Sequence, residues 1–273
     1  MGKLAFLFPG QGAQVVGMGK DFFDAYDLAK KRFAEADEAL GYSISKLCFE
    51  GPADQLQLTE HTQPAILTVA VIASELLRAE GIEPEIAAGH SLGEYAALVA
   101  AGVLSFQDAV LLVHKRGAYM QEAVPVGEGA MAAVIGLDDE TIVSACAEAS
   151  SVGAVQAVNF NCPGQTVIAG TAKGVEHAVT LLQEKGAKKA VILPVSAPFH
   201  STLMEPAAKK LAAELDKVEL HDAVFPVVSN FTGGLQQTAA EIKANLVAQA
   251  DHPVRWIACV NTMRDFGADT YVE

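Results

Sequence analysis

A serine between two glycines constrains the fold of this chain more than any other feature. Gly89-His90-Ser91-Leu92-Gly93 follows a short apolar run at residues 86–88 and precedes a helical pattern at residues 94–101. A strand, a G-x-S-x-G turn and a helix form a nucleophile elbow, in which small neighbours allow the backbone to turn sharply. The serine hydroxyl would then lie at a helix N-terminus, where free N–H groups stabilise negative charge. A glycine-flanked turn serine without chemistry is the alternative reading.

A serine hydroxyl needs a base within hydrogen-bonding distance to attack a carbonyl near neutral pH. Among the seven histidines, His200 has the best position, because it lies in a loop that leads into a predicted helix. His90 is expected to point away from its neighbour Ser91, and His114 and His177 are expected on helix surfaces. The sequence contains no HExxH or other metal-ligand spacing, so no metal site is predicted.

Arg116 is a second candidate site residue. On the helix predicted from Ser105 to residue 122, it lies on the apolar face between Leu112 and Met120. An unpaired buried charge costs several kcal/mol, so this guanidinium requires a partner. An internal carboxylate or the anionic group of a ligand would serve, and the pattern leaves both open.

The first apolar run, residues 3–8, shows no alternation, which predicts a central strand buried on both faces. It ends at a glycine-rich turn, Pro9-Gly10-Gln11-Gly12-Ala13-Gln14. The third glycine of a dinucleotide-binding fingerprint would fall at Val15, so that function is rejected. The turn can still direct a backbone N–H toward a ligand at the carboxyl end of the strand.

Residues 126–195 are predicted to form a separate subdomain. Their order is strand, helix, strand, strand, helix, strand, at residues 130–136, 138–149, 154–160, 165–170, 171–185 and 189–195, which is the ferredoxin-like unit. The unit would be inserted into a core made of residues 1–125 and 196–273, with hinges near Pro125 and Pro194.

The remaining core elements are predicted from their caps and periodicity. Helices are expected at residues 21–40 and 62–79, the second with Pro64 in its first turn. Thr202 and Glu205 are expected to form a capping box for a helix that reaches residue 215. Residues 223–230 are expected to form a strand, with Pro226 indicating an edge or a bulge. Helices at residues 238–249 and 254–266 and a strand at residues 268–273 complete the prediction.

Composition excludes several classes of protein. The net charge of −14 argues against a nucleic-acid or anionic-membrane surface, and no apolar run is long enough to cross a bilayer. The N-terminus lacks signal-peptide architecture, and the four scattered cysteines suit a reducing cytoplasm rather than a disulfide framework. Lys185, Lys188 and Lys189 form a local basic cluster, which is interpreted as a helix end rather than a docking patch for an acidic partner.

Five motifs together identify a family. Their order and spacing resemble those of the malonyl-CoA:acyl carrier protein transacylases over essentially the whole chain. The motifs are Gly10-Gln11-Gly12-Ala13-Gln14, Gly89-His90-Ser91-Leu92-Gly93-Glu94, Arg116, Asn159-Phe160-Asn161 through Pro163-Gly164-Gln165, and Ala197-Pro198-Phe199-His200-Ser201. The resemblance implies an α/β-hydrolase-like core with a parallel sheet and an inserted ferredoxin-like subdomain.

The resemblance also implies roles for individual residues. Ser91 would be the nucleophile, His200 the general base and acid, and Arg116 the clamp for the malonyl carboxylate. The backbone N–H groups of Gln11 and Leu92 would form an oxyanion hole. A main-chain carbonyl near Gln249, rather than the carboxylate of Asp251, would orient the imidazole.

The implied reaction transfers malonyl from coenzyme A to the phosphopantetheine thiol of an acyl carrier protein, for fatty-acid or polyketide chain elongation. Malonyl-CoA is then a substrate, and no tightly bound cofactor is expected. A cytoplasmic monomer is expected, without nucleic-acid or membrane partners. Family members normally continue past a terminal strand such as residues 270–273 into a Gly-Pro-Gly turn and a final helix, which this sequence does not contain.

Two other functions stay open on the residues alone. A serine hydrolase, such as a thioesterase, would release malonate without an acceptor and would use an Asp or Glu partner for the histidine. Asp108, Asp138 and Asp139 lie between Ser91 and His200 in the sequence but are poorly placed for that role. A non-catalytic binding protein is the third possibility, which the combination of serine and histidine disfavours.

Overall fold

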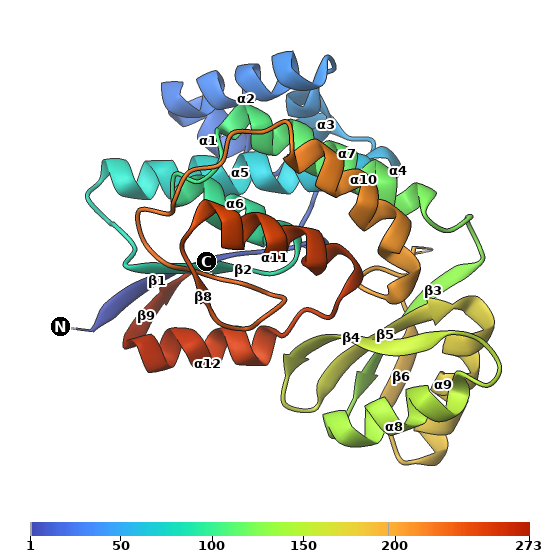
Figure 1. Cartoon of the computed structure of the whole chain (residues 1–273). Helices are drawn as coiled ribbons and strands as arrows, with labels where there is room; N and C mark the ends of the chain where they lie inside the picture. Colours follow the sequence, from blue (N-terminus) through green and yellow to red (C-terminus); the bar gives the residue numbers. More distant parts are fainter. Residues whose placement is uncertain (1, 196) are drawn as a thin grey trace.

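The computed structural model describes residues 2–195 and 197–273, and the strands of this part form two sheets (Figure 1). Residues 1 and 196, which begin the two segments predicted to form the core, lie outside the described residues. In chain order the elements are β1 (Lys3–Phe8), α1 (Lys20–Ala25), α2 (Asp27–Leu40), α3 (Ile44–Glu50), α4 (Ala53–Leu56), α5 (Thr59–Ala79), β2 (Ile86–Gly89), α6 (Leu92–Ala100), α7 (Phe106–Glu122), β3 (Gly129–Ile135), α8 (Asp139–Ala149), β4 (Val155–Cys162), β5 (Gln165–Thr171), α9 (Ala172–Glu184), β6 (Lys189–Ile192), the 3₁₀ helix η1 (Thr202–Met204), α10 (Glu205–Leu215), β7 (Val227–Val228), β8 (Leu235–Gln236), α11 (Ala239–Asp251), α12 (Trp256–Phe266) and β9 (Ala268–Val272).

The core sheet has the strand order β8-β7-β2-β1-β9. Its β1, β2, β7 and β9 strands run parallel, and only the edge pair β7–β8 is antiparallel. The register pairs Phe8 with Gly89, so β1 and β2 end side by side. Because the carboxyl ends of parallel strands share one edge of a sheet, the glycine-rich turn after β1 lies beside the serine turn after β2.

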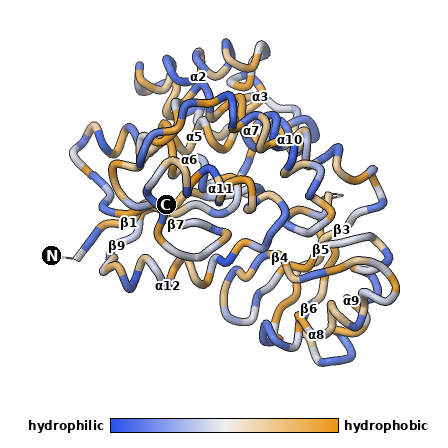
Figure 2. Tube along the Cα trace, in the orientation of Figure 1, coloured by the Kyte–Doolittle hydropathy of each residue, from blue (hydrophilic) through white to orange (hydrophobic). Residues whose placement is uncertain are grey.

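Helices bury both faces of this sheet, as the unbroken apolar run of β1 predicted. Phe6, Phe8 and Ala87 pack into the large hydrophobic cluster formed with α2, α5, α6 and α7. The alternate residues Ala5 and Ile86 pack on the other face, against α12. Figure 2 shows the corresponding hydrophobic colouring along the inner segments, with hydrophilic residues on the outer turns of α2.

The α5 and α7 helices lie close together at Gly117. A Cβ atom at this position would lie 2.6 Å from the carbonyl oxygen of Thr59. The missing side chain therefore lets the two helix backbones touch. This contact brings Arg116, the preceding residue on α7, against the first turns of α5.

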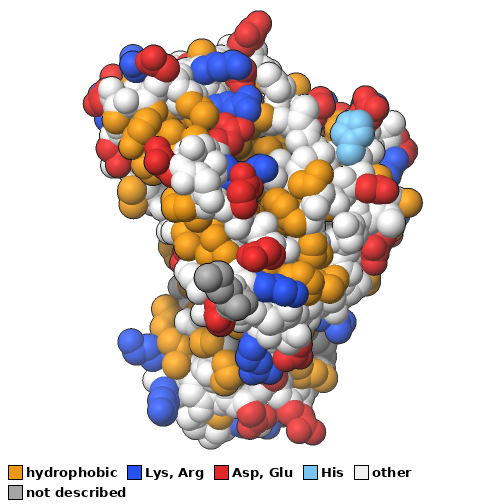
Figure 3. Space-filling model, turned by 90° about the vertical axis from the view of Figure 1, so that its left-hand side faces the viewer, with side chains coloured by type: hydrophobic (Ala, Val, Ile, Leu, Met, Phe, Trp, Pro, Cys, Tyr) orange, Lys and Arg blue, Asp and Glu red, His pale blue; other side chains and the backbone are white. Residues whose placement is uncertain are grey.

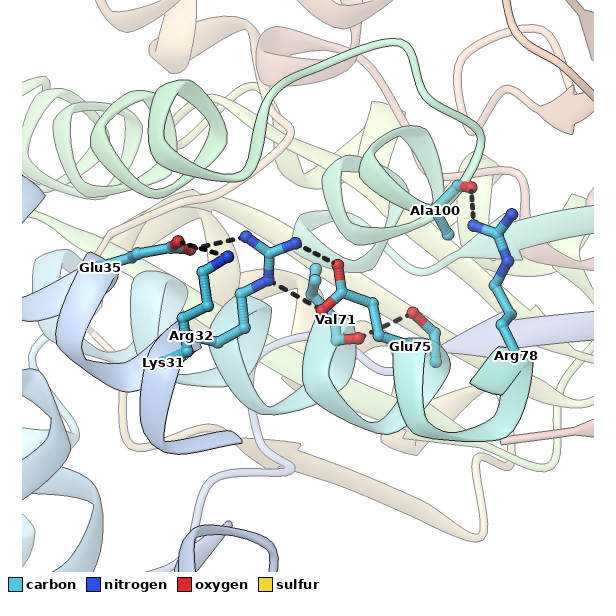
Figure 4. A network of polar contacts seen from close by, with 8 residues as sticks. Lys31, Arg32, Glu35, Val71, Glu75, Arg78 and Ala100 are labelled. Carbon is cyan, nitrogen blue, oxygen red and sulfur yellow. Dashed lines mark hydrogen bonds and ion pairs between the residues drawn. The ribbon is translucent and has the colours of Figure 1, made fainter. Parts of the chain in front are cut away.

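An ion-pair network ties the outer helix α2 to α5 (Figure 4). Arg32 donates from Nε and Nη2 to Glu75 at 2.8 and 2.6 Å, and from Nη1 to Glu35 at 2.6 Å. The hydrogen bonds to Glu75 raise the pKa of Arg32 against the opposing effect of burial. Arg78 on α5 reaches the carbonyl oxygen of Ala100 at 3.0 Å and so holds the end of α6 as well. On the face drawn in Figure 3, acidic and basic side chains are similarly interspersed.

The second sheet, β4-β5-β3-β6, is antiparallel and is packed against α8 and α9. The four strands and two helices occur in the predicted ferredoxin-like order. Five of the six elements match the predicted bounds within two residues, whereas β6 ends at Ile192 rather than at residue 195. Its hydrophobic cluster, which includes Ile142, Ile168 and Leu182, is separate from the core cluster. We therefore propose residues 126–195 as a subdomain inserted into the core of residues 1–125 and 196–273.

The α5 helix begins earlier than predicted, so Pro64 lies inside it rather than in its first turn. Proline has no N–H group and leaves the carbonyl four residues before it without its helical partner. Here His114 Nδ1 lies 2.9 Å from the Glu60 carbonyl oxygen and replaces that partner. His114 was expected on the surface, but this contact makes it half-buried.

Two other predicted elements are interrupted. The helix predicted at residues 21–40 breaks at Tyr26, whose backbone is extended. The break lets Phe23 of α1 pack against Phe33 of α2, with ring centroids 6.0 Å apart. The strand predicted at residues 223–230 is paired only at Val227–Val228, because Pro226 cannot donate to a ladder.

The predicted capping box at Thr202 and Glu205 is wrong. Thr202 begins a 3₁₀ turn with no side-chain cap, and Glu205 instead pairs with Lys209 at 2.7 Å. The last helix begins at Trp256 rather than at residue 254, because Val254 is bonded to the insert: its N–H donates to Val158 and its carbonyl accepts from Phe160. The predicted start of α11 is confirmed, since the Thr238 side chain accepts from the Glu241 N–H.

Replacing Gly117 with alanine tests the α5–α7 contact. At an unconstrained helix position this change stabilises by about 1 kcal/mol, whereas overpacking costs about 1–3 kcal/mol. Since the new Cβ would meet backbone, we expect the free energy of unfolding to fall by about 1–2 kcal/mol in urea denaturation. Gly234→Ala is the control, because its Cβ would have 3.6 Å to its nearest neighbour. An unchanged or increased stability of Gly117→Ala would contradict the close packing.

Candidate active site

Ser91 lies on the turn between β2 and α6 with the backbone angles φ 52° and ψ −104°. Non-glycine residues rarely adopt positive φ, so neighbouring contacts must hold this conformation. A Cβ at Gly89 would lie 1.9 Å from the carbonyl carbon of Gly93, and one at Gly93 would lie 2.0 Å from the Phe8 oxygen. The two glycines of the motif are therefore required by close backbone contacts.

Asn230, which follows β7, fastens this turn. Its Oδ1 accepts from the Ser91 N–H at 2.6 Å, and its Nδ2 donates to the Gly89 carbonyl at 2.8 Å. Asn230 is entirely buried, so these groups have no water to replace the bonds. The side chain thereby holds both sides of the strained serine.

His200 lies directly against the serine. Its Nε2 is 2.7 Å from Ser91 Oγ, and its Nδ1 is 2.8 Å from the carbonyl oxygen of Gln249. Because a carbonyl can only accept, Nδ1 carries the proton and Nε2 is free to accept from the serine hydroxyl. Burial, followed by the charge of Arg116, lowers the pKa of His200 to about 3. The imidazole is therefore neutral at physiological pH.

Arg116 is buried, with 1% of its surface exposed, and it contacts only neutral acceptors. Its Nη1 donates to Gln63 Oε1 at 2.8 Å, and its Nη2 donates to Gln249 Oε1 at 2.9 Å and Ser91 Oγ at 3.0 Å. Burial lowers the pKa of Arg116, and its Nε has no hydrogen-bond partner among the described residues. Within residues 2–195 and 197–273 no carboxylate forms a direct ion pair with it, although the nearby charge of Glu94 acts to raise its pKa. The guanidinium can therefore still pair with an anion of a ligand.

The glycine-rich turn lies against the serine turn, as the strand register requires. A Cβ at Gly10 would be 2.5 Å from the His90 carbonyl oxygen. Gln11 and Leu92 both line the cavity beside Ser91. Among the described residues, no protein acceptor receives a hydrogen bond from either backbone N–H. These two donors are thus available to a ligand oxygen.

The cavity has a volume of about 130 Å³ and lies between the core and the insert. The insert side contributes Met131 and Asn159, and the segment that returns to the core contributes Leu193 and Val195. A larger cleft of about 710 Å³ between the insert and α12 contains none of the predicted site residues. The chemistry therefore belongs to the smaller cavity.

The other polar residues considered in the sequence bond to other partners. His90 points away from Ser91 and places its Nε2 2.9 Å from Asn161 Oδ1. Asp251 pairs with His252, at 2.7 Å, and not with His200. Asp108, Asp138 and Asp139 bond the side chains of Ser105, Thr141 and Thr166 respectively. Among the described residues, therefore, no carboxylate orients the imidazole, and the Gln249 carbonyl does so.

Three site residues escaped the sequence prediction. Gln63 holds Arg116, Asn230 holds Ser91, and Glu94 is fully buried behind the serine turn. Glu94 lies among apolar residues on α6, which is the same signal that identified Arg116 on α7. Gln63 and Asn230 have no comparable signal, because their polar side chains contact residues distant in the sequence.

Within residues 2–195 and 197–273, no three His, Cys, Asp or Glu side chains are grouped closely enough to hold a metal ion. In the same part of the chain, no helix has both the length and the hydropathy needed to span a bilayer.

The comparisons with known proteins agree along the whole chain. The family model described as the acyl transferase domain matches residues 5–273. A malonyl CoA-acyl carrier protein transacylase from Bacillus subtilis is 51% identical over all of this chain and 86% of its own length. The Escherichia coli K12 protein of the same name is 48% identical, over all of this chain and 89% of its own.

Solved structures give the same result. An acyl-carrier-protein S-malonyltransferase from Burkholderia pseudomallei superposes with a TM-score of 0.97 at 50% identity, covering 99% of this chain and 88% of that one. A malonyl-transacylase solved in complex with a type II PKS acyl-carrier protein also has a TM-score of 0.97, at 45% identity, covering 99% of this chain and 88% of that one.

The lowered pKa of His200 predicts the pH dependence of Ser91 reactivity. An imidazole with the usual pKa of 6.5 would lose about 90% of its neutral form at pH 5.5, whereas a lowered pKa retains the neutral, proton-accepting form. We expect an uncharged sulfonyl fluoride to label Ser91 at pH 5.5 within about twofold of its rate at pH 7.5. Labelling is followed by mass spectrometry, with Ser91→Ala as the blank. A half-maximal rate near pH 6.5 would refute the lowered pKa.

Proposed function

The chain belongs to the acyl transferase family, and we propose that it transfers malonyl from malonyl-CoA to the phosphopantetheine thiol of an acyl carrier protein. The observation that carries this proposal is the buried guanidinium of Arg116, 3.0 Å from Ser91 Oγ and without a carboxylate of its own. A malonyl thioester has its reactive carbonyl and its carboxylate only one carbon apart. Ser91 Oγ and the Arg116 guanidinium are correspondingly close, so the serine can attack the carbonyl while the guanidinium binds the carboxylate.

Ser91 is the proposed nucleophile. Its Oγ attacks the thioester carbonyl while its proton passes to His200 Nε2, 2.7 Å away. The tetrahedral intermediate then collapses, the carbon–sulfur bond breaks, and His200 returns the proton to the thiolate of coenzyme A. The product is a malonyl ester of Ser91. The second half-reaction reverses these steps, with the carrier-protein thiol as nucleophile and His200 as its base.

The backbone N–H groups of Gln11 and Leu92 are the proposed oxyanion hole. Both line the cavity, and both lack an acceptor among the described residues. Leu92 is the first residue of α6, where the helix dipole also favours negative charge. Fixed donors of this kind stabilise charge that develops in the transition state and typically contribute about 3–4 kcal/mol each.

The carbonyl of Gln249 is the proposed orienting group for His200. A neutral carbonyl stabilises an imidazolium less than a carboxylate would. This weaker support suits thioester exchange, because a thiolate is a good leaving group and each half-reaction begins and ends with a thiol. A hydrolase was expected to have an acidic partner at this position, and a carbonyl occupies it.

The proposed partners are malonyl-CoA and an acyl carrier protein, with no nucleic acid or membrane and with no tightly bound cofactor. The proposed setting is the cytoplasm, where the thiols of Cys48, Cys146, Cys162 and Cys259 would stay reduced. We propose a monomer, since the site is built from one chain.

Arg116→Ala tests the carboxylate clamp. Hydrogen bonds to a charged group contribute about 1.5–3 kcal/mol, so kcat/KM for malonyl-CoA should fall by about ten- to a hundredfold. Acylation by acetyl-CoA should be retained or increased, because an acetyl group leaves the guanidinium unmatched. The measurement is the mass of the Ser91 ester formed from each thioester. Arg264→Ala on the exposed face of α12 is the control, and wild-type malonyl turnover in Arg116→Ala would remove Arg116 from the site.

A further inference from the structure

Glu94 is the one carboxylate that is fully buried among the described residues, as Arg116 is the one buried guanidinium. It lies in the first turn of α6, directly behind Ser91. Its Oε2 accepts from the Asn230 N–H at 3.0 Å and from Gln249 Nε2 at 2.7 Å, and its Oε1 accepts from Gln236 Nε2 at 2.7 Å. All three donors are neutral. Burial raises the pKa of Glu94 to about 6, so the group is ionised at pH 7 and above.

The Gln249 side chain lies between these two buried charges. Its Nε2 donates to Glu94 and to the Ser91 carbonyl at 3.0 Å, while its Oε1 accepts from Arg116 Nη2 at 2.9 Å. An amide has a donor end and an acceptor end, whereas an ionised carboxylate can only accept. Glu94 and the Ser91 carbonyl both only accept, so together they turn the NH₂ end of the Gln249 amide toward themselves and its oxygen toward the guanidinium.

This arrangement separates the two charges by one side chain. A direct ion pair would occupy the Arg116 guanidinium and compete with a ligand anion for it. With Gln249 between them, Arg116 has an oriented neutral acceptor and still lacks an ionic partner. The negative charge of Glu94 remains near enough to lower the energy of the buried cation.

We propose that Glu94 is a positioning residue for substrate selection: it fixes the Gln249 amide with its oxygen toward Arg116, and so holds the guanidinium in place for the acyl carboxylate. This role rests on the malonyl transfer proposed above. Glu94 touches no substrate atom. It acts on Arg116 through Gln249, and it also accepts from the N–H of Asn230, which fastens the serine turn.

The substitution Glu94→Leu removes both acceptor oxygens and little volume. Gln249 Nε2 then keeps only the Ser91 carbonyl as an acceptor, so its amide no longer holds Arg116 firmly. The matched variant Glu94→Gln keeps an amide oxygen toward the Asn230 N–H and Gln249 Nε2, which share Oε2, and turns its NH₂ toward Gln236. Gln249 therefore keeps its orientation in Glu94→Gln.

The test compares wild type, Glu94→Leu, Glu94→Gln and the exposed control Glu219→Gln with malonyl-CoA and acetyl-CoA. For Glu94→Leu we expect the malonyl-to-acetyl ratio of kcat/KM to fall about tenfold, as for loss of one hydrogen bond to a charged group. For Glu94→Gln and Glu219→Gln we expect that ratio to stay within about threefold of wild type. A ratio that is unchanged in Glu94→Leu, or that falls as far in Glu94→Gln, would overturn the proposal.

The variant Gln249→Ala covers the case in which Glu94→Leu does not fold. Because Glu94 acts on Arg116 through the Gln249 amide, removing that amide should lower the same ratio about tenfold as well. A ratio unchanged in Gln249→Ala would refute the role of Glu94. Absence of malonyl transfer in the wild type would instead refute the proposed function, so the two failures are distinguishable.

Discussion

The hydrogen bond between Ser91 Oγ and His200 Nε2 is the contact on which the rest of the site depends. Both residues have positive φ, 52° and 61°, and each such backbone costs of order 1–3 kcal/mol. Buried polar groups hold both conformations: Asn230 fastens the serine turn, and the Gln249 carbonyl fixes the imidazole. The residues that secure the pair come from the end of the core sheet and from α11, so the site forms only when distant segments have folded together.

The charge arrangement follows from burial rather than from ion pairing. Surface charges such as Arg32 have carboxylate partners, whereas Arg116 has only amides and a hydroxyl around it. A surface pair contributes little to stability and is easily replaced. A buried guanidinium without an anion raises the free energy of the free protein. A ligand carboxylate that reaches the guanidinium removes this penalty, whereas an uncharged acyl group does not, so the penalty favours acyl groups that carry a carboxylate.

Periodicity and caps predicted much of this fold. The six elements of the insert and the sheet strands at both ends of the chain follow from local patterns. Pro64 was predicted in the first turn of its helix but lies further inside it. The side chain of His114, 50 residues further along the chain, replaces the hydrogen bond that Pro64 cannot donate. The strand around Pro226 was predicted too long. Pro226 has no N–H group to donate to a ladder, and the apolar pattern of residues 223–230 does not show which of its positions pair with β2.

Prediction of the site was uneven for a similar reason. Ser91 and Arg116 violate a local pattern, one by its glycines and the other by a charge on an apolar face. Glu94 on α6 shows the same signal as Arg116, a charged residue among apolar ones, equally clearly. Gln63 and Asn230 could not be found this way, because a polar residue near a turn or a helix start is ordinary until its distant partner is known.

The insert is joined to the core by backbone as well as by its two connecting segments. The Val254 N–H donates to the Val158 oxygen at 2.8 Å, and the Val254 oxygen accepts from the Phe160 N–H at 3.0 Å, next to Asn159 in the cavity wall. Backbone bonds at this point hold the insert wall of the cavity against the core beside Ser91. Coenzyme A and the carrier protein differ greatly in size but end in the same slender pantetheine arm. A cavity wall held by backbone suits a reaction in which the same arm is presented twice, once by each thiol.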